Sequence, residues 1–518
     1  MSRVMNRTEP ILPEIPMDLW HRLLDLWPVI TPMLGAVVLI LMRLNLGRTA
    51  LLYEGALTLL SLICYMSAAV LMVTNLFVRV DLLNRLGLLS LALGVCFNFS
   101  GWMIRWMEAG DAESWRGGIN GVWRYFPLDN LYSLTLGFCF GAGITTLIVA
   151  RKPRYEFVGA LSLPIVTVIL TVAILLGNDI TTLPPILDSY WRPIHVSVAT
   201  IAYGVCLVSF GLAFAYLLKD GIRSESIGIA TALFGLLVYV SIGRSAIPAH
   251  AEYGASLIVG KASVPLRAVL PAVGPIMTAV LVLLVVSLAL FVFDWFKHDE
   301  KARRWGWRAF RVAAAAQAVV LAALFYQIKH LDSLVSRIPD REYPAFGQWL
   351  AKQMEASVPA NQQAELARSW IQQNAAGLSL SYKSNPVEIG GLIALFVVLL
   401  LVALFAWRRD RVVSAMPALE TIDSLLYRTV GVAFPLLTLL LITGAVWANE
   451  SWGRYWGWDS KEVGALVSWI SYAAFLHTRV SHGWRGRRSA YFALLGFALV
   501  VFTWLGVSYL LPGLHSYA

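Results

Sequence analysis

The sequence predicts an all-α fold, namely a polytopic membrane bundle of about 13 transmembrane helices with a small external helical insert. Three observations support this prediction. Hydrophobic residues make up 58% of the 518 positions and charged residues only 14%, whereas soluble domains carry about 25% charged residues. Apolar windows of membrane-spanning length recur along the chain. Only one long polar stretch, 328–387, interrupts them. A soluble globular protein is therefore excluded.

The predicted helices follow the apolar windows in chain order. Each window approaches the roughly 20 residues that a helix needs to cross the hydrocarbon core of a bilayer. The windows fall at 26–42, 56–78, 87–106, 130–150, 157–177, 193–218, 227–243, 269–293, 309–327, 388–407, 425–447, 461–479 and 489–511. The windows 26–42 and 227–243 are the shortest and give the weakest signals.

The polar stretch 328–387 predicts a small external cap of two amphipathic helices, at about 343–357 and 359–375. Leucine, methionine and tryptophan recur at helical spacing within both segments. This cap divides the chain into four predicted regions. They are an N-terminal membrane bundle (1–220), inserted transmembrane helices (221–327), the cap (328–387) and a C-terminal membrane domain (388–518).

The charge balance is evidence about topology. The chain has 41 Lys and Arg against 31 Asp and Glu, and basic residues of membrane proteins gather in cytoplasmic loops. Lys and Arg are concentrated in the loops that lie inside when the N-terminus is cytoplasmic. The predicted orientation is therefore a cytoplasmic N-terminus and an external C-terminus. No cleavable signal peptide is apparent at the start, so the first helix is expected to act as an anchor.

A tryptophan-rich stretch carries the densest chemistry of the sequence. Within GAVWANESWGRYWGWDSKEVGALVSWI lie Trp447, Trp452, Trp456, Trp458 and Trp469. An interfacial aromatic belt needs only a few rings at headgroup depth. Here polar residues, Asp459 among them, are interleaved with the rings. This pattern is typical of an aromatic platform for a large, flat, conjugated ligand whose carboxylates must be held.

Histidines near the predicted external face sharpen this hypothesis. His195 opens a predicted helix and His515 follows the last one, so both are expected at the face that carries the tryptophans. Neutral imidazole is a common iron ligand, and both are therefore candidate axial ligands of a haem. His250, in an external loop, remains an alternative to His195, which the sequence favours for its helix-terminal position. His477 lies about 22–24 Å deeper in its helix, where a histidine is a candidate functional residue.

These residues resemble the CcsA family, also called ResC, the tryptophan-rich "WWD" membrane component of System II cytochrome c biogenesis. The resemblance rests on LLYRTVGVAFPLLTLLLITGAVWANESWGRYWGWDSKEVGALVSWISYAAFLHTR and LGVSYLLPGLHSYA, and on the patches YFPLDNLYS (Tyr125 to Ser133) and YWRPIHVSVATIAYG (Tyr190 to Gly204). After Trp458 and Asp459 the family usually continues P-K-E-T-W, whereas S-K-E-V-G follows here. The inserted helices and the cap lengthen the chain between the second patch and the C-terminal match.

The resemblance implies a function. Members of the family are understood to move haem across the membrane and to present it at the outer face to apocytochrome c, where its vinyl groups form thioethers with a C-x-x-C-H motif. By position, His195 and His515 match the external ligands and His477 an intramembrane ligand. The WWD segment is matched by Trp452, Trp456, Trp458 and Asp459. The implied cofactor is haem b, bound as cargo.

The resemblance also implies partners and a location. A CcsB-like (ResB-like) subunit is expected to supply a second intramembrane histidine, and a thioredoxin-like protein to keep the acceptor cysteines reduced. With the CcsB-like subunit the chain would form a holocytochrome c synthase, a haem lyase. The expected location is a bacterial plasma membrane, with a plastid membrane less favoured.

Three other functions stay open on the sequence alone. The chain could bind and export haem without joining it to a protein, because the same ligands serve both roles. It could be a b-haem subunit of a respiratory complex, although the histidine pairs of such subunits usually lie at membrane depth. An ordinary solute transporter would place its site near the midplane between two repeats, and the sequence shows no such repeat.

Overall fold

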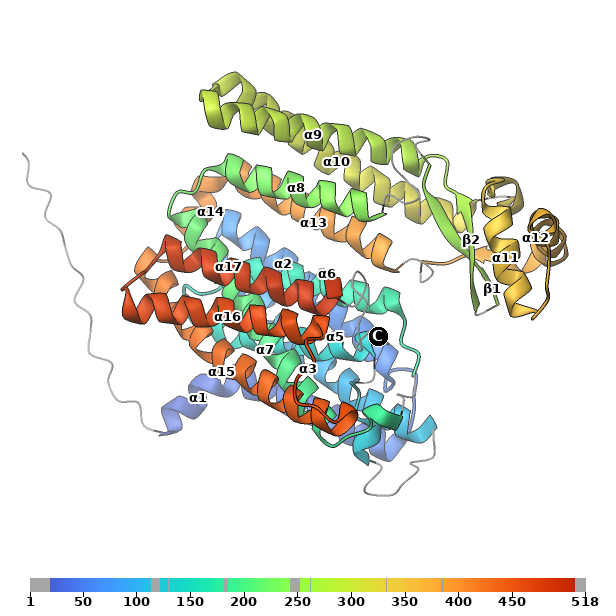
Figure 1. Cartoon of the computed structure of the whole chain (residues 1–518). Helices are drawn as coiled ribbons and strands as arrows, with labels where there is room; N and C mark the ends of the chain where they lie inside the picture. Colours follow the sequence, from blue (N-terminus) through green and yellow to red (C-terminus); the bar gives the residue numbers. More distant parts are fainter. Residues whose placement is uncertain are drawn as a thin grey trace, which may run out of the picture.

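The computed structural model describes residues 19–112, 122–128, 130–180, 185–242, 252–260, 262–331, 333–382 and 386–507. Within these residues, twelve helices are long and apolar enough to cross a membrane. The chain is therefore a multi-pass, all-α membrane protein, as predicted. Figure 1 shows two helical bundles side by side and a small cap at one end.

The larger bundle is formed by the two ends of the chain. It contains α1 (Leu19–Leu46), α2 (Glu54–Val78), α3 (Asp81–Ala112), α5 (Leu131–Ala150), α6 (Phe157–Leu176), α7 (Trp191–Lys219), α15 (Leu419–Trp452), α16 (Ser460–Ser481) and α17 (Arg487–Val501). Helix α7 lies at its centre and packs against α5, α15 and α17. A Cβ at Gly204 of α7 would lie 2.3 Å from the backbone nitrogen of Ala142. Small residues thus let α5 and α7 approach closely.

The second bundle has its own hydrophobic core. It contains α8 (Ser224–Ile242), α9 (Val273–Lys297), α10 (Glu300–His330) and α13 (Pro386–Trp407). A buried polar chain joins three of these helices. The Tyr239 hydroxyl donates to Gln317 Oε1 at 2.7 Å, and Gln317 Nε2 donates to the Leu392 carbonyl at 3.0 Å. Helix α13 connects this bundle to the larger one by packing against α6.

The cap combines the two predicted helices with a sheet that the sequence analysis did not predict. Its elements are β1 (Gly254–Val259), β2 (Ala262–Val269), α11 (Glu342–Gln353), α12 (Ala360–Asn374) and β3 (Leu378–Leu380). The strands form an antiparallel sheet in the order β2-β1-β3. Phe346 and Ile371 of the two helices pack with Leu257 and Leu266 of the strands. The cap therefore has a core of its own.

Short elements complete the described chain. They are η1 (Val122–Tyr125), η2 (Pro185–Leu187), η3 (Leu334–Arg337), η4 (Ala375–Gly377), α14 (Arg409–Ala415) and the π-helical turn η6 (Phe502–Gly506).

Each predicted membrane window corresponds to a helix. The predicted number of about 13 exceeds the twelve apolar spans because α16 is less apolar than the others. It carries charged residues near both ends, yet it packs along α15 and α17 over its length. The window 489–511 runs past Val507 into residues outside the described part of the chain.

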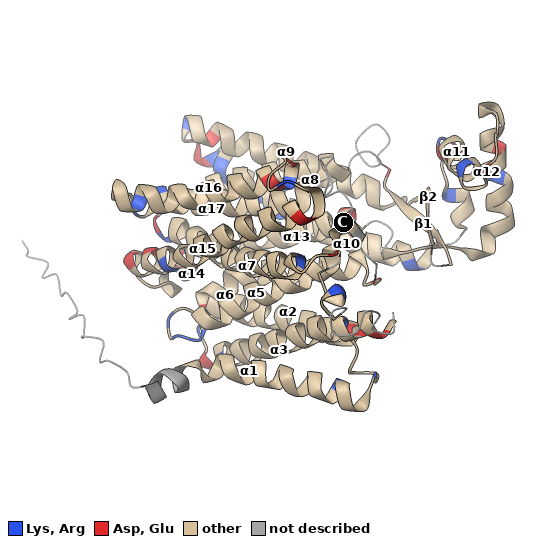
Figure 2. Cartoon of the chain, turned by 60° about the horizontal axis from the view of Figure 1, so that its bottom comes forward, with Lys and Arg blue, Asp and Glu red and all other residues tan. Residues whose placement is uncertain are grey.

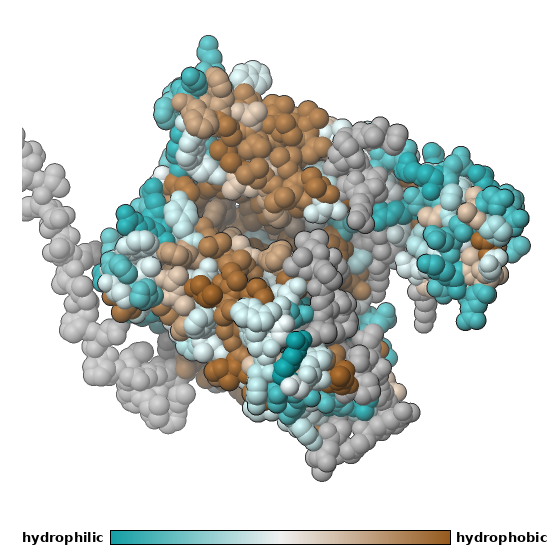
Figure 3. Space-filling view, viewed as in Figure 1, coloured by the Kyte–Doolittle hydropathy of each residue, from teal (hydrophilic) through white to brown (hydrophobic). Residues whose placement is uncertain are grey.

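The cap and the tryptophan-rich loop lie at the same end of the molecule, called the cap end below (Figure 1). Helix α13 leads away from the cap to α14, and α15 returns from there to the loop 453–459. Figure 2 shows the positions of Lys, Arg, Asp and Glu gathered near helix ends and in the cap. Figure 3 shows the apolar surface between them, on the helices. This distribution fits a bundle whose middle faces lipid.

Candidate functional site

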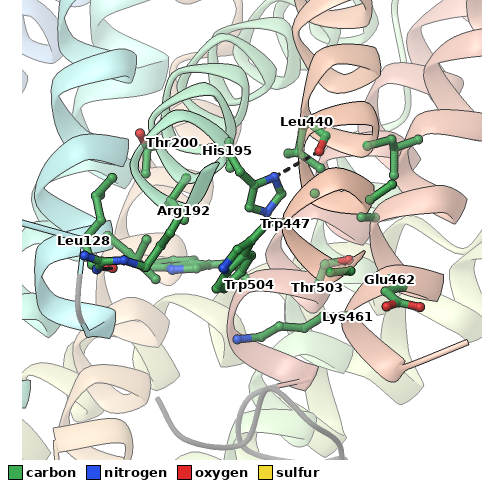
Figure 4. Close-up of a pocket in the computed structure, with 18 of the residues that line it drawn as sticks. Leu128, Arg192, His195, Thr200, Leu440, Trp447, Lys461, Glu462, Thr503 and Trp504 are labelled. Atoms are coloured by element: carbon green, nitrogen blue, oxygen red, sulfur yellow. Dashed lines mark hydrogen bonds between the residues drawn. The ribbon is translucent and has the colours of Figure 1, made fainter. Parts of the chain in front are cut away.

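A cavity of about 170 Å³ opens at the cap end of the larger bundle. Its walls come from α5, α7, α15, α16 and the turn that follows α17, and the loop 453–459 borders it. Most of the lining is apolar or aromatic, with a few polar groups. Figure 4 shows these side chains around the central hollow. Apolar clefts with a few convergent polar groups are the usual form of cofactor sites.

His195 lies in the α7 wall and is oriented by α15. Its Nδ1 lies 3.0 Å from the Leu440 carbonyl oxygen and 3.4 Å from Thr443 Oγ1 (Figure 4). Because a carbonyl can only accept, Nδ1 carries the hydrogen and the ring lone pair is on Nε2. A metal-binding imidazole is held in the same way, with one nitrogen donating to a carbonyl and the other coordinating. In this tautomer, Nε2 is the ring nitrogen that can coordinate a metal.

A glycine makes room for this imidazole. A Cβ at Gly444 of α15 would lie 2.7 Å from Cε1 of His195 and 3.0 Å from its Nδ1. Any larger residue would displace the ring or the helix. Gly444 is not among the residues predicted from the sequence, although its position one turn before Trp447 is a signal that could have identified it.

Tryptophan rings lie next to His195 in the wall of the cavity. The ring centroids of His195 and Trp447 are 5.7 Å apart, and those of Trp447 and Trp452 are 5.9 Å apart. Trp456 also lines the cavity. Trp458 differs, because 73% of it is exposed and it does not line the cavity. Of the five tryptophans in the stretch, Trp447, Trp452 and Trp456 thus lie around the cavity, whereas Trp458 and Trp469 do not line it.

The Trp-Asp pair of the motif forms the turn that starts α16. Trp458 has a left-handed φ of 58°. The Asp459 carboxylate caps the helix by accepting from the backbone of Lys461 at 3.0 Å, and Glu462 completes a capping box by accepting from the Asp459 backbone at 3.2 Å. Glu462 also accepts from Gly457 N at 2.7 Å. Asp459 thus fixes the loop that borders the cavity.

A π-helical turn widens the end of α17 where it reaches the cavity. Such turns are rare and frequently occur at functional sites. Thr503 and Trp504 of this turn line the cavity, and Trp504 packs edge-on against Phe138 of α5. The sequence analysis missed both residues, because hydropathy does not distinguish a π turn from an α-helix.

The remaining predicted ligands are not brought together in the described structure. His515 and the alternative His250 lie outside the described residues. His477 lies 17 positions beyond Ser460 in α16, roughly 25 Å along the helix axis and far from the cavity. Its ring is exposed and contacts the His482 ring at 5.7 Å. Its Nδ1 lies 3.5 Å from Ser481 Oγ.

Comparison with known proteins places this chain in a family. The family model for the cytochrome C assembly protein matches residues 128–325 and 385–515. The chain belongs to this family. The matched ranges include the patch that carries His195 and the whole tryptophan-rich segment.

Curated relatives agree with this membership. A protein named cytochrome c biogenesis protein CcsA from Guillardia theta is 41% identical over 167 residues, covering 29% of this chain and 55% of that protein. The protein of the same name from Gloeobacter violaceus is 55% identical over 98 residues, 19% of this chain and 29% of that protein. The match therefore spans about half or less of these two relatives. The namesake from Nostoc punctiforme is 27% identical over 419 residues, 80% of this chain and 82% of that protein.

Proposed function

We propose that this chain takes part in cytochrome c maturation by binding haem in the cap-end cavity and presenting it there for covalent attachment to apocytochrome c. The observation that carries the proposal is His195, whose Nδ1 donates to a backbone carbonyl beside a cavity walled by tryptophan. Family membership and the CcsA relatives support the same role.

The cavity fits haem b in its chemistry. Iron takes imidazole nitrogen as an axial ligand, and the tautomer of His195 with its hydrogen on Nδ1 and its lone pair on Nε2 suits this role. The indole rings of Trp447, Trp452 and Trp456 give flat apolar surfaces for a porphyrin face. His515 remains the proposed second axial ligand at this face. Haem is cargo here, bound and then passed on.

The chain would contribute to the reaction by holding haem in position for the incoming thiols. In thioether formation, the S–H bond of a cysteine adds across a haem vinyl group, so that sulfur bonds one vinyl carbon and hydrogen goes to the other. This addition is redox-neutral, so it consumes no oxidant once the cysteines are reduced thiols. Holding the vinyl edge where the thiols of a C-x-x-C-H segment arrive converts an encounter between molecules into an oriented reaction. The acceptor histidine would then replace one axial ligand of the chain.

An unusual face of α16 supports a membrane partner. His477 is exposed, and 39% of Val467, 48% of Ile470 and 73% of Val480 are exposed along the same helix. Ionisable residues in membrane helices normally face protein or water rather than lipid. A CcsB-like subunit packed on this face would bury His477 and supply a second histidine for an inner haem. A thioredoxin-like reductant of the acceptor thiols completes the proposed set of partners.

The proposed location is the plasma membrane of a bacterium, with the cap end on the outer side. Relatives named CcsA come from cyanobacteria and from algae. The orientation rests on the distribution of basic residues in the loops.

The test is the haem content and absorption spectrum of the full chain purified with a CcsB-like subunit. We expect six-coordinate haem in the wild type, loss of the axial ligand in His195→Ala, and recovery when imidazole is added. His515→Ala should behave in the same way. His330→Ala is the matched control, because His330 is exposed at the end of α10 and outside the cavity. An unchanged spectrum in His195→Ala would overturn the ligand assignment.

A second measurement separates attachment from transport alone. Co-expression with an apocytochrome c that carries C-x-x-C-H should give covalently bound haem with the wild type and much less with His195→Ala. If haem reaches the outer face but no thioether forms, the chain exports haem without taking part in its ligation.

A further inference from the structure

Helix α10 carries three arginines on one face near its start, at the end of the molecule opposite the cap (Figure 1). Arg304, Arg308 and Arg311 are spaced by four and three residues, which places them on one side of a helix. Gly306 and Phe310 lie on the other side and are buried. The three arginines are exposed, with 70% of the Arg304 side chain accessible. This surface is called the arginine face below.

The packing of α10 against α9 shows how deep the arginine face lies. Ser287 Oγ of α9 donates to the Gly306 carbonyl at 3.1 Å, and a Cβ at Gly306 would lie 2.8 Å from Cε1 of Phe291. Gly306 is thus level with the uncharged stretch 273–293 of α9. The two arginines that follow Gly306 lie still further from the helix start. Exposed cations at the depth of an apolar surface are costly unless they reach polar groups.

The side chains of these two arginines bend toward the start of α10. The Arg308 guanidinium carbon lies 4.6 Å from the centroid of the Trp305 ring, about one turn earlier in the helix. Arg311 Nε donates to the Trp307 carbonyl at 3.1 Å, also one turn earlier. Long basic side chains near a membrane surface bend in this way to bring their charge to the headgroups. Trp305 is 59% exposed, and tryptophan is enriched at headgroup depth.

Other basic side chains at the same end of the molecule bind acceptors on other elements of the chain. Lys219 Nζ of α7 donates to the Met416 carbonyl at 2.8 Å, and Arg479 of α16 donates to Asp423 at 2.5 Å. The arginine face differs, because within the described ranges all its partners belong to α10 itself. Its guanidinium groups therefore remain accessible to a ligand from outside the chain.

The same side of α10 becomes apolar beyond Arg311. Val312, Ala315 and Val319 continue it toward the cap and are exposed, the two valines by 54% and 53%. A surface with cations at one end and an apolar strip at the other fits an amphiphile, with a phosphate on the arginines and an acyl chain along the strip. Arginine binds phosphate oxygens bidentately, and basic clusters beside membrane helices attract anionic lipids.

We propose that the arginine face binds an anionic phospholipid, whose phosphate is held by Arg304, Arg308 and Arg311 and whose acyl chain lies along the apolar strip. Between positions 297 and 311 six basic residues stand against two acidic ones. An anionic headgroup is therefore preferred to a zwitterionic one. The site is separate from the cavity and does not depend on haem binding.

The experiment measures lipid binding to the purified full chain in detergent by native mass spectrometry, with phosphatidylglycerol and phosphatidylcholine of identical acyl chains. Wild type should bind phosphatidylglycerol about tenfold more tightly, the size expected when arginines contact an anionic headgroup. Arg308→Gln/Arg311→Gln should lose most of this preference. Arg308→Lys/Arg311→Lys should keep part of it, because lysine retains the charge but not the planar fork of donors.

Two controls separate this site from general charge effects and from a site for free phosphate. Lys152→Gln/Arg154→Gln removes two exposed cations from the loop between α5 and α6, at the same end of the molecule, and should leave the preference as in the wild type. Inorganic phosphate at millimolar concentration should not displace the lipid, because the ion makes no contact with the apolar strip.

Four results would overturn the lipid site. One is equal affinity of the wild type for the two lipids, and another is an equal loss of preference in both glutamine double variants, which would mean that net charge alone sets it. Displacement by inorganic phosphate would make the face a site for the free ion. If Arg308→Gln/Arg311→Gln binds lipid as the wild type does but no longer binds a CcsB-like subunit, the face is a protein interface instead.

Discussion

His195 and His477, the two described histidines with predicted roles, lie at opposite ends of the α15–α17 region and have opposite surroundings. His195 is held by the Leu440 carbonyl, lies against Gly444 and contacts the Trp447 ring. His477 is exposed on the outer face of α16 and has a long contact with Ser481. The imidazole of His195 is thus held in place by contacts within this chain, whereas the imidazole of His477 is exposed at its surface.

This contrast shows how much of each site the chain forms without a partner. At the cap end, four helices, the turn after α17 and a capped loop surround a cavity, so the orientation of His195 is set before anything binds. At the other end, a helix face carries a histidine among exposed apolar residues. Such a face becomes a binding site only when another surface covers it.

The largest expected effect tests the dependence of the inner histidine on a partner. His477→Ala should abolish haem binding at the inner end when a CcsB-like subunit is present, and should change nothing in the chain alone. Haem counted by pyridine haemochrome in both preparations measures this. His482→Ala is the control, because its ring is only 5.7 Å from His477. Full haem binding by His477→Ala in the complex would remove the contrast between the two ends.

The next effect concerns the aromatic wall. Trp447 is 5% exposed and Trp458 is 73% exposed. Trp447→Ala should destabilise the protein by about 3–5 kcal/mol because it leaves a cavity beside His195, whereas Trp458→Ala should cost within about 0.5 kcal/mol. Unfolding followed in detergent, together with the haem spectrum, measures both. Similar costs would mean that the loop is arranged differently from the structure described here.

The third prediction concerns Gly444, which leaves room for the His195 ring. Gly444→Ala should cost about 1–3 kcal/mol through overpacking against the ring and should shift the haem spectrum. Gly431→Ala on the same helix meets nothing within 4 Å and should be neutral or stabilising by up to about 1 kcal/mol. If both variants keep the wild-type spectrum, the contact with Gly444 does not position His195.

The smallest expected effect concerns the helix cap. Asp459→Ala should cost about 1 kcal/mol of stability, the usual value of an N-cap, and should also weaken haem binding because the loop that borders the cavity moves. Asp299 caps α10 by the same two backbone contacts, at 2.7 and 2.9 Å, but lies away from the cavity. Asp299→Ala should therefore lose stability alone. Equal haem affinity in both variants would mean that the Asp459 N-cap does not contribute to haem binding.

Several parts of this structure follow from local sequence patterns. The membrane helices are visible because each needs a continuous apolar window, and the cap helices because their apolar residues recur at helical spacing. The β1–β2 hairpin was missed, although β-branched runs on either side of Gly260, which has a φ of 60°, are a hairpin signal. The strand β3 could not have been found, because three residues without their partner carry no signal.

The candidate site was predicted in part. His195 and the tryptophans were identified by residue type and motif, and the structure brings His195, Trp447, Trp452 and Trp456 to one cavity. Trp458 could not be separated from them, because its exposure depends on a left-handed backbone turn.

Composition, spacing and motif therefore suffice to predict the membrane-spanning fold and the kinds of chemical group available. Which of those groups lie next to one another depends on how the helices pack. The tautomer of His195 depends on a carbonyl 245 positions away in the chain. A second contact of the same ring, with Thr443 Oγ1, spans 248 positions. Contacts across long sequence separations are set by packing, and no local pattern records them.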